Sequence, residues 1–445
     1  MSSAEVDPEP AAGEIRRGAV GDVAKDPAVA PSIWRNGAFV RLFTAASVSY
    51  VGSFITRTAL PLAAIYGLSA GALELSAIRS FEFIGWLLVG LAAGAWVDRL
   101  RRRPVMIAAD LGRAVILASI PVAALAGSLT LVHLVAAAFL AAILSVFFDA
   151  ASGAYLPSIV ARSRLVAANS AMSASASIAE FTGFGISGVL VQVLTAPIAI
   201  AVDAVSFVGS ALVLATIRQP EPARPPAADR EPVLREIREG IDVVAHSPIL
   251  RALAIAHAAN HLLWGVFGAT YLLFAVDELG LSAAAIGVIT AIGGLGSFLG
   301  AAVASRVVAR IGAGRSMIFG LAGTVIGSSL IPLAPAGAAL VGGLFLIAQQ
   351  IVGDASGTVY EVVEDSVTQT IVHDRVLGRV RATVSVVTTV TALAGTILGG
   401  VIGAAFGLRI AFLVGIAGAV VAVLAVWWSP AGRLRRIEDA EPIAA

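Results

Sequence analysis

The sequence predicts an all-α membrane protein with twelve transmembrane helices in two six-helix bundles and with both termini in the cytoplasm. Three observations support this prediction. Hydrophobic residues make up 58% of the 445 residues and charged residues only 13%, with a mean hydropathy of +0.91. That composition suits helices that face lipid rather than a soluble domain. The arginines are clustered between long apolar stretches, and the two halves of the chain repeat similar motifs.

The arginine clusters predict the topology. Consecutive clusters are separated by about 50 to 60 residues, enough for two membrane spans and a turn. Positively charged loops remain in the cytoplasm, so every second loop is expected to be inside. The turns between paired spans contain a single basic residue, Arg409. The clusters after the N-terminal segment are 99–103, 162–164, 218–251, 306–315, 375–381 and 433–436.

Apolar stretches of sufficient length define twelve spans, the first six in one half of the chain and the last six in the other. The predicted spans are 38–66, 74–97, 105–126, 130–153, 168–192, 197–217, 250–276, 283–305, 316–334, 338–360, 384–406 and 409–428.

The spans divide the chain into five parts. Residues 1–35 are polar and predict a disordered cytoplasmic tail. Residues 36–217 and 250–428 are the two predicted bundles, and 429–445 form a second cytoplasmic tail. The segment 218–249 is a predicted cytoplasmic linker, whose later part is amphipathic and typical of a helix at the membrane surface.

Composition also excludes several kinds of chemistry. The chain has no cysteine, so disulfides and Cys-based metal sites are excluded. The one lysine is Lys25, and no glycine-rich phosphate-binding loop is present, so ATP-driven transport is not expected. We expect no enzyme activity, no cofactor and no metal. The expected partners are small-molecule substrate, protons and the lipid bilayer, without nucleic acid.

Two pairs of motifs predict an internal repeat. Residues 94–103, after the second span, are similar to 305–315, after the eighth. Residues 149–155, at the end of the fourth span, are similar to 354–360 in the tenth. Because each half has six spans, both copies have the same orientation, and the repeat is expected to be parallel.

These motifs resemble the major facilitator superfamily of transporters. The loop after the second span matches the family's Gly-x-x-x-Asp-Arg-x-Gly-Arg-Arg signature, with Arg101 where Gly is usual. Gly183-Phe-Gly-Ile-Ser-Gly188 resembles the antiporter motif of drug:proton exchangers, and 156–169 with 377–381 resemble the branch of macrolide and siderophore exporters. The signature residues are Gly94, Asp98, Arg99, Arg102 and Arg103.

The resemblance implies a secondary active exporter of small amphipathic molecules, such as a drug, natural product or siderophore. It implies proton-coupled antiport by alternating access, in the inner membrane of a bacterium, and we expect a monomer. One alternative is an importer or uniporter with the same fold. Another is a non-transporting membrane receptor or assembly protein.

Charges near the cytoplasmic ends of spans 2–4 predict a gate, because a charge within the bilayer requires a partner or a function. Asp110 and Arg113 are three residues apart and share a helix face. Asp354 is the expected counterpart in span 10, with Arg379 or Arg381 as its partner. The alternative is a static set of ion pairs. The gating residues are Asp98, Arg99, Arg102, Asp110, Arg113 and Asp354, with Asp149 in the same group.

Glu180, in span 5, is the main candidate for proton coupling. It lies near the predicted midplane with no basic residue in its own span, so its carboxyl group could bind and release a proton as the site opens to each side. Asp149 is the second proton-coupling candidate. The alternative for Glu180 is a permanently protonated side chain that is hydrogen-bonded to a neighbouring helix. Asp203, in span 6, is a weaker candidate.

The predicted substrate cavity combines groups from both halves. Arg57, Arg79 and Glu82 lie in the outer halves of spans 1 and 2, as a cavity wall, an external gate or an ordinary salt bridge. By the resemblance, spans 1, 4, 7 and 10 line the cavity. The second half would contribute His257, Asn260, His261, Trp264, Gln349 and Gln350; helix–helix hydrogen bonding is the alternative for these polar groups.

Overall fold

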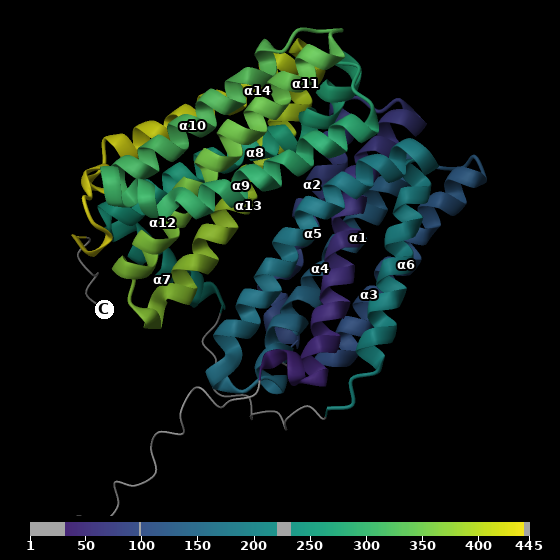
Figure 1. The fold of residues 1–445 in the computed structure, drawn as a ribbon, viewed down its shortest axis with the longest axis horizontal. Coiled ribbons are helices and arrows are strands. Elements are labelled where there is room, and N and C mark those ends of the chain that lie inside the picture. Colours follow the sequence, from purple (N-terminus) through teal and green to yellow (C-terminus); the bar gives the residue numbers. More distant parts are fainter. Residues whose placement is uncertain (1–31, 98, 220–232, 440–445) are drawn as a thin grey trace, which may run out of the picture.

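The computed structural model describes residues 32–97, 99–219 and 233–439. Within these ranges every regular element is helical and no strand occurs. The first half contains six long helices, shown in purple to teal in Figure 1. They are α1 (Gly37–Leu68), α2 (Ala72–Val97), α3 (Arg102–Leu125), α4 (Leu131–Ile159), α5 (Leu165–Leu194) and α6 (Ala196–Ala215).

The second half also contains six membrane-length segments, two of which include a π-helical turn. The amphipathic helix α7 (Val233–His246) precedes them. The segments are α8 (Pro248–Leu273) with η4 (Phe274–Glu278), α9 (Ala283–Ile311), α10 (Ala313–Leu333), α11 (Ala339–Gln349) continuing through η5 (Gln350–Asp354) into α12 (Ala355–Ile371), α13 (Asp374–Phe406) and α14 (Leu408–Trp427).

Twelve helical segments correspond to the twelve predicted spans. Eleven of them, in the described chain, are long and apolar enough to cross a membrane. The remaining one, α2, has 26 residues and packs along α4 within the first bundle and along α13 of the second. The predicted all-α membrane fold is therefore confirmed, whereas the cytoplasmic location of both termini stays a prediction.

The predicted boundaries of spans 10 and 11 were wrong. The predicted span 10 ends at residue 360 and the predicted span 11 begins at 384, because charged residues fill the interval. In the structure α12 continues to Ile371 and α13 begins at Asp374. Val359, Val363 and Val367 are buried at helical spacing through this interval, so the apolar face continues although the opposite face is polar.

The two bundles contact each other mainly through two helix pairs, α5 with α9 and α2 with α13, and α2 also contacts α8. Small residues permit this close approach. A Cβ atom at Gly188 would lie 2.7 Å from the Cα atom of Gly287, and Gly400 packs directly against Ser76. These four residues lie near the ends of their helices that are remote from the linker.

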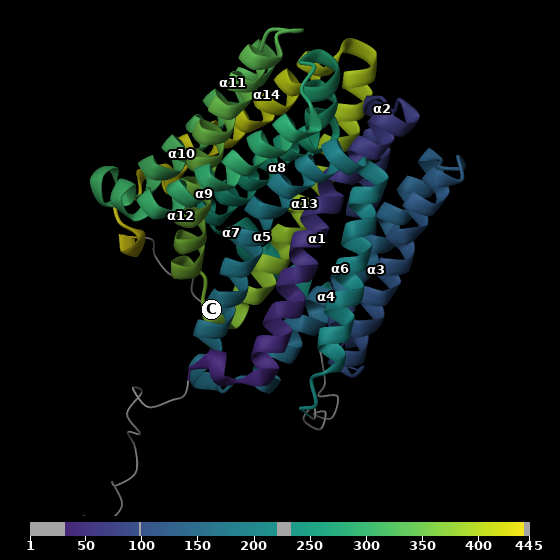
Figure 2. The ribbon, with the colours of Figure 1, turned by 45° about the vertical axis from the view of Figure 1, so that its right-hand side comes forward.

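We call the end of the molecule where α6 ends and α7 begins the linker end, and the opposite end the far end. The bundles pack together at the far end, through the glycine contacts described above. Their ribbons diverge toward the linker end (Figure 1), and the turned view shows the same two groups of helices (Figure 2).

Helix α7 docks on the second bundle at the linker end. It packs against α13 and α8. Gly240 lies directly against the backbone of Arg379 and the side chain of Thr383, and Glu239 forms an ion pair with Arg379. Ile241, an apolar residue of the amphipathic segment, is half-exposed. The docked face is therefore centred on the glycine, whose missing side chain allows the helices to approach.

Candidate functional site

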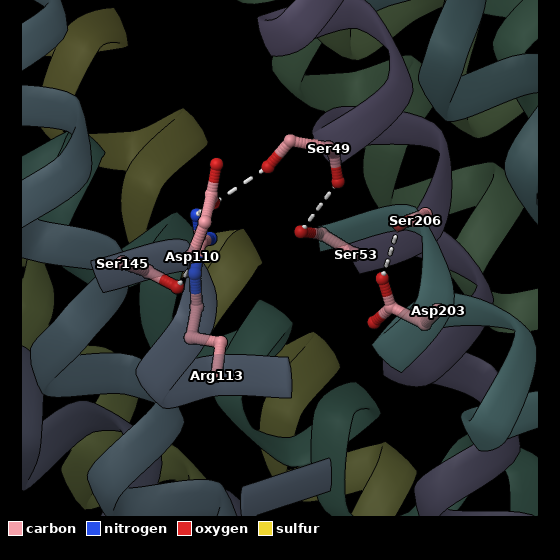
Figure 3. Close-up of polar contacts among 7 residues, drawn as sticks. All are labelled: Ser49, Ser53, Asp110, Arg113, Ser145, Asp203 and Ser206. Atoms are coloured by element: carbon pink, nitrogen blue, oxygen red, sulfur yellow. Dashed lines mark hydrogen bonds and ion pairs between the residues drawn. The ribbon is translucent and has the colours of Figure 1, made fainter. Parts of the chain in front are cut away.

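A buried polar network occupies the interior of the first bundle (Figure 3). Asp110 and Arg113 form an ion pair one turn apart on α3, and their side chains are 0% and 4% exposed. Arg113 also donates hydrogen bonds to Ser145 on α4 at 3.2 Å and to Ser49 on α1 at 3.4 Å. Its guanidinium carbon lies 4.0 Å from the ring centroid of Phe207 on α6. One guanidinium therefore connects four helices, because a buried charge requires compensation from every side.

Only part of the predicted cytoplasmic gate is assembled in this structure. Asp98 lies outside the described residues. Arg99 is exposed in the turn before α3, and Asp149 is exposed on α4, close enough to Arg113 and Asp110 for an electrostatic interaction. The named partners of the Asp110–Arg113 pair all belong to the first bundle.

Asp203, the weaker proton-coupling candidate, is fully buried in the first bundle. Its side chain is 0% exposed on α6. It accepts hydrogen bonds from the hydroxyl groups of Thr56 at 2.5 Å and of Ser206 at 3.1 Å. Gly52 faces the same carboxyl group, and any side chain at that position would collide with it. The carboxyl group is therefore held between α1 and α6 by hydroxyl donors.

Arg79 and Glu82 form a salt bridge on α2, with Nη1 and Oε2 at 2.6 Å. The Arg79 guanidinium reaches the second bundle, because a Cβ atom at Gly268 of α8 would lie 3.4 Å from Arg79 Nε. Gly268 precedes the far-end turn η4 by six residues. The Arg79–Glu82 pair thus lies toward the far end, where the two bundles are in contact.

Arg57 on α1 and Glu180 on α5 are both exposed, although they lie in the middle of membrane-spanning helices. Arg57 interacts electrostatically with Arg79, Glu82 and Glu180. Glu180 in turn is close enough to Asp354 and Glu361 of the second bundle to interact with them. Within the described residues, no salt bridge shorter than 4 Å joins Arg57 to a carboxylate. Glu180 therefore interacts with acidic groups across the bundle interface and with the positive charge of Arg57.

The proposed equivalence of Asp149 and Asp354 does not agree with the helix register. Asp149 lies ten residues before the end of α4 at Ile159, whereas Asp354 lies seventeen residues before the end of α12 at Ile371. Asp354 is therefore about two turns deeper in its span. Glu361, ten residues before Ile371, lies at the depth of Asp149.

The predicted partners of Asp354 are engaged elsewhere. Arg379 forms an ion pair with Glu239, and Arg381 lies 3.8 Å from Asp365. Asp354 instead lies at the end of η5, where its Oδ2 approaches Gly293 of α9 and its Oδ1 is buried without a hydrogen-bond partner. The gating pairs expected in the second half are therefore not formed in this structure.

One face of α8 is partly exposed, and it carries three of the predicted cavity residues. His257, His261 and Trp264 follow one another at helical spacing, and Trp264 is 41% exposed. The other three predicted residues of the second half are buried: Asn260, Gln349 and Gln350 are 4%, 2% and 8% exposed. Their burial among packed helices does not fit a role in lining an open cavity.

Sequence reasoning missed three acidic residues of α12: Glu361, Glu364 and Asp365. Glu364 is only 8% exposed, and its Oε2 lies 3.8 Å from His257 Nδ1. These residues were assigned to a loop because span 10 was ended too early. The valines that continue on the opposite face were the signal that could have placed them on the helix.

The comparison with known protein families agrees with this architecture. The model of the Major Facilitator Superfamily matches residues 42–256 and again residues 253–442. This chain belongs to the Major Facilitator Superfamily. The two matches cover the two bundles separately, as expected for a parallel repeat. The chain is therefore a multi-pass membrane transporter, and its family and fold are not those of an enzyme.

Among characterised proteins, the chain is similar to the multidrug efflux pump Tap of Mycolicibacterium fortuitum. The two are 30% identical over 365 residues, which cover 77% of this chain and 85% of Tap.

Solved structures with a similar fold include transporters and homologues of transporters of several kinds. The nucleoside transporter NupG superposes with a TM-score of 0.69 at 12% identity, over 87% of this chain and 98% of its own. An inward-facing bacterial homologue of the iron transporter ferroportin gives 0.71 at 17% identity, over 89% and 98%. An inward-facing, unoccupied bacterial homologue of the lysosomal transporter Spinster gives 0.71 at 14% identity, over 92% and 99%. These likenesses show the fold alone.

Proposed function

We propose that this protein is a proton-coupled exporter of small amphipathic molecules from the bacterial cytoplasm, with drugs, natural products or siderophores as the substrate class. The similarity to a multidrug efflux pump supports export. The arginine clusters at the linker end support a cytoplasmic location for that end and for both termini. With this orientation, the contact between the bundles at the far end corresponds to an inward-facing state, as in the structures of the Spinster and ferroportin homologues.

The exposed carboxyl group of Glu180 is the observation on which proton coupling rests. It lies on α5 between the bundles, without a salt-bridge partner in the described residues, and faces Asp354 and Glu361. Adding a proton would relieve repulsion among these groups, and losing it would restore that repulsion. A carboxyl group at a moving interface can therefore couple its proton occupancy to the conformational equilibrium.

Asp149 is the second proposed proton-coupling group, because it is exposed on α4 beside the Asp110–Arg113 pair. We propose that the substrate occupies the region bounded by Arg57, Glu180 and the partly exposed face of α8. The Arg79–Glu82 pair would close this region at the far end, where Arg79 contacts α8. The bundles would rock about the bound substrate, and the chain would act as a monomer.

Glu180→Gln tests the coupling directly. In proteoliposomes with an imposed pH gradient, wild-type protein should accelerate transport of a fluorescent probe such as ethidium. The variant should still bind the probe, but its transport should fall to the rate without a gradient, because glutamine cannot release a proton. Binding is measured by probe fluorescence anisotropy.

The matched control is Glu438→Gln, which removes an exposed carboxyl group beyond the last span. It should leave pH-driven transport unchanged. If Glu180→Gln retains the full acceleration by the pH gradient, Glu180 is not the coupling group. Reversing the gradient in vesicles of known orientation separates export from import.

A further inference from the structure

The second bundle contains a largely buried histidine–glutamate pair between α8 and α12. His257 of α8 and Glu364 of α12 approach each other with Nδ1 and Oε2 at 3.8 Å. Their side chains are 21% and 11% exposed. His257 Nδ1 has no hydrogen-bond partner within the described residues. The two groups are thus close enough for an electrostatic interaction but too far apart for a hydrogen bond.

The imidazole ring of His261 limits the two histidines to one positive charge. The rings of His257 and His261 are stacked, with centroids 4.6 Å apart and an interplanar angle of 18°. His261 Nδ1 lies 2.9 Å from the carbonyl oxygen of His257, so Nδ1 of His261 carries the hydrogen and donates to this oxygen. Two stacked imidazolium ions would repel each other at this separation. Only one of the two stacked rings can therefore bind an additional proton at a time.

Glu364 is oriented toward His257 by its other contacts. Its Oε1 accepts a hydrogen bond from the Thr368 hydroxyl at 3.0 Å, one turn along α12. Arg381 of α13 interacts electrostatically with Glu364 and lies 3.8 Å from Asp365. The remaining oxygen of Glu364 is thus available to His257.

The other titratable groups near the pair come from the three helices packed around it. Among the described residues, these are His261 on α8, Tyr360, Glu361 and Asp365 on α12, and Arg381 on α13. Glu361 and Asp365 flank Glu364 along the helix and are exposed. They provide a polar route from the surface to the buried pair. No metal-ligand cluster of three or more side chains is present in the described part of the chain.

We propose that His257 and Glu364 form a proton-binding site of the second bundle, which is loaded from the linker end. A proton from water binds Nδ1 of His257, and the resulting N–H donates to Oε2 of Glu364. Before protonation Nδ1 and Oε2 are two acceptors that face each other without a hydrogen bond, whereas the charge-assisted hydrogen bond formed after protonation is favourable. Protonation would therefore draw α8 and α12 together.

This site deepens the proton coupling proposed above by adding a second binding group, in the opposite bundle from Glu180. The face of α8 that carries His257 and His261 continues through Trp264 to Gly268, where Arg79 of the first bundle makes contact. A small movement of α8 on protonation would reach the contact between the bundles. Proton occupancy at this pair would then bias the opening of the far end.

Histidine NMR tests the binding site without a substrate. The chain has five histidines, and ¹⁵N-histidine spectra of the full-length protein in detergent micelles are titrated with acid. His257→Gln assigns its resonance. Glu364→Gln should lower the proton affinity of His257 by about tenfold or more, because an adjacent carboxylate is removed. His373→Gln, at an exposed position before α13, should leave the other titrations unchanged.

An unchanged titration of His257 in Glu364→Gln would overturn the site. If that variant does not fold, His257→Gln gives the reciprocal measurement, since the infrared carboxyl band of Glu364 should then change its pH dependence; an unchanged band would also overturn the site.

Transport in proteoliposomes tests the coupling separately. His257→Gln and Glu364→Gln should each reduce pH-driven probe transport at least tenfold. Glu364→Gln, which lies outside the proposed substrate region, should leave downhill transport of the probe unchanged. Undiminished pH-driven transport would overturn the coupling role, even if the NMR result supports proton binding. If wild-type protein shows no pH-driven transport, the proposed antiport fails, while the NMR titration still decides whether the pair binds a proton.

Discussion

The side chain of Arg113 is almost fully buried, and its charge is compensated within one bundle. Asp110 neutralises it, serine hydroxyls of α1 and α4 accept hydrogen bonds from it, and the ring of Phe207 lies beneath it. Removing one member of a buried pair leaves the other charge uncompensated. The network therefore has a clear structural role in holding four helices together.

Asp110→Asn should destabilise the protein by about 3–5 kcal/mol, because it leaves Arg113 buried without its counter-ion. The measurement is thermal unfolding in detergent, with Asp439→Asn, an exposed substitution outside the bundles, as the control. An unfolding midpoint equal to that of the control would show that the pair contributes little to stability. Double substitution with Arg113→Leu should recover part of the loss.

Individual residues differ in how far the sequence could predict them. The spacing of Asp110 and Arg113 on one helix was enough to place them together. The burial of Asp203 and the pairing of His257 with Glu364 depend on contacts between helices far apart in the sequence. The register of Asp354 could not be read from its motif, because α12 extends beyond the matched segment.

The contacts of Arg409 explain why one basic residue lies at the far end, where the topology rule expects none. It lies at the start of α14, where Nε bonds Glu278 at 2.8 Å. Its Nη1 and Nη2 donate to the carbonyl oxygens of Pro332 at 2.6 Å and Ala334 at 2.7 Å. These carbonyl groups belong to the end of α10, so one guanidinium caps one helix and fastens two others.

Arg409→Gln should loosen this junction by about 1–3 kcal/mol, because the two carbonyl oxygens and Glu278 lose their donors. Hydrogen–deuterium exchange should increase in 274–281 and 332–338, with little change at the linker end. Arg433→Gln, which removes an exposed arginine near the linker end, is the control. Equal exchange in both variants would contradict an anchoring role.

At the scale of helices, hydropathy was sufficient for the number and order of spans. It failed where a helix carries charges on one face only, as in α12. The π-helical turns η4 and η5 were also beyond prediction, because a single extra residue per turn changes the apolar pattern very little.

At the scale of the whole molecule, the two bundles contact each other at the far end, mainly through α5 with α9 and α2 with α13. The sequence predicted the two bundles from the repeat, but it could not predict which end is closed. Both conformations of a transporter use the same helices, and their difference lies in rigid-body packing of a few kcal/mol. Small residues such as Gly188 and Gly287 permit the closed arrangement seen here.

An engineered disulfide across α5 and α9 tests whether transport requires the bundles to separate at the far end. A Cβ atom at Gly185 would lie 3.6 Å from the Cβ atom of Ala291, within the range for a disulfide. The chain has no cysteine of its own, so Gly185→Cys with Ala291→Cys gives one defined crosslink. The single substitutions are the controls.

The decisive measurement is pH-driven probe transport by this double variant in proteoliposomes, before and after reduction with dithiothreitol. Alternating access predicts that the oxidised protein is inactive and that reduction restores transport to the rate of the single variants. Full transport by protein that is quantitatively crosslinked would contradict the rocking of the two bundles.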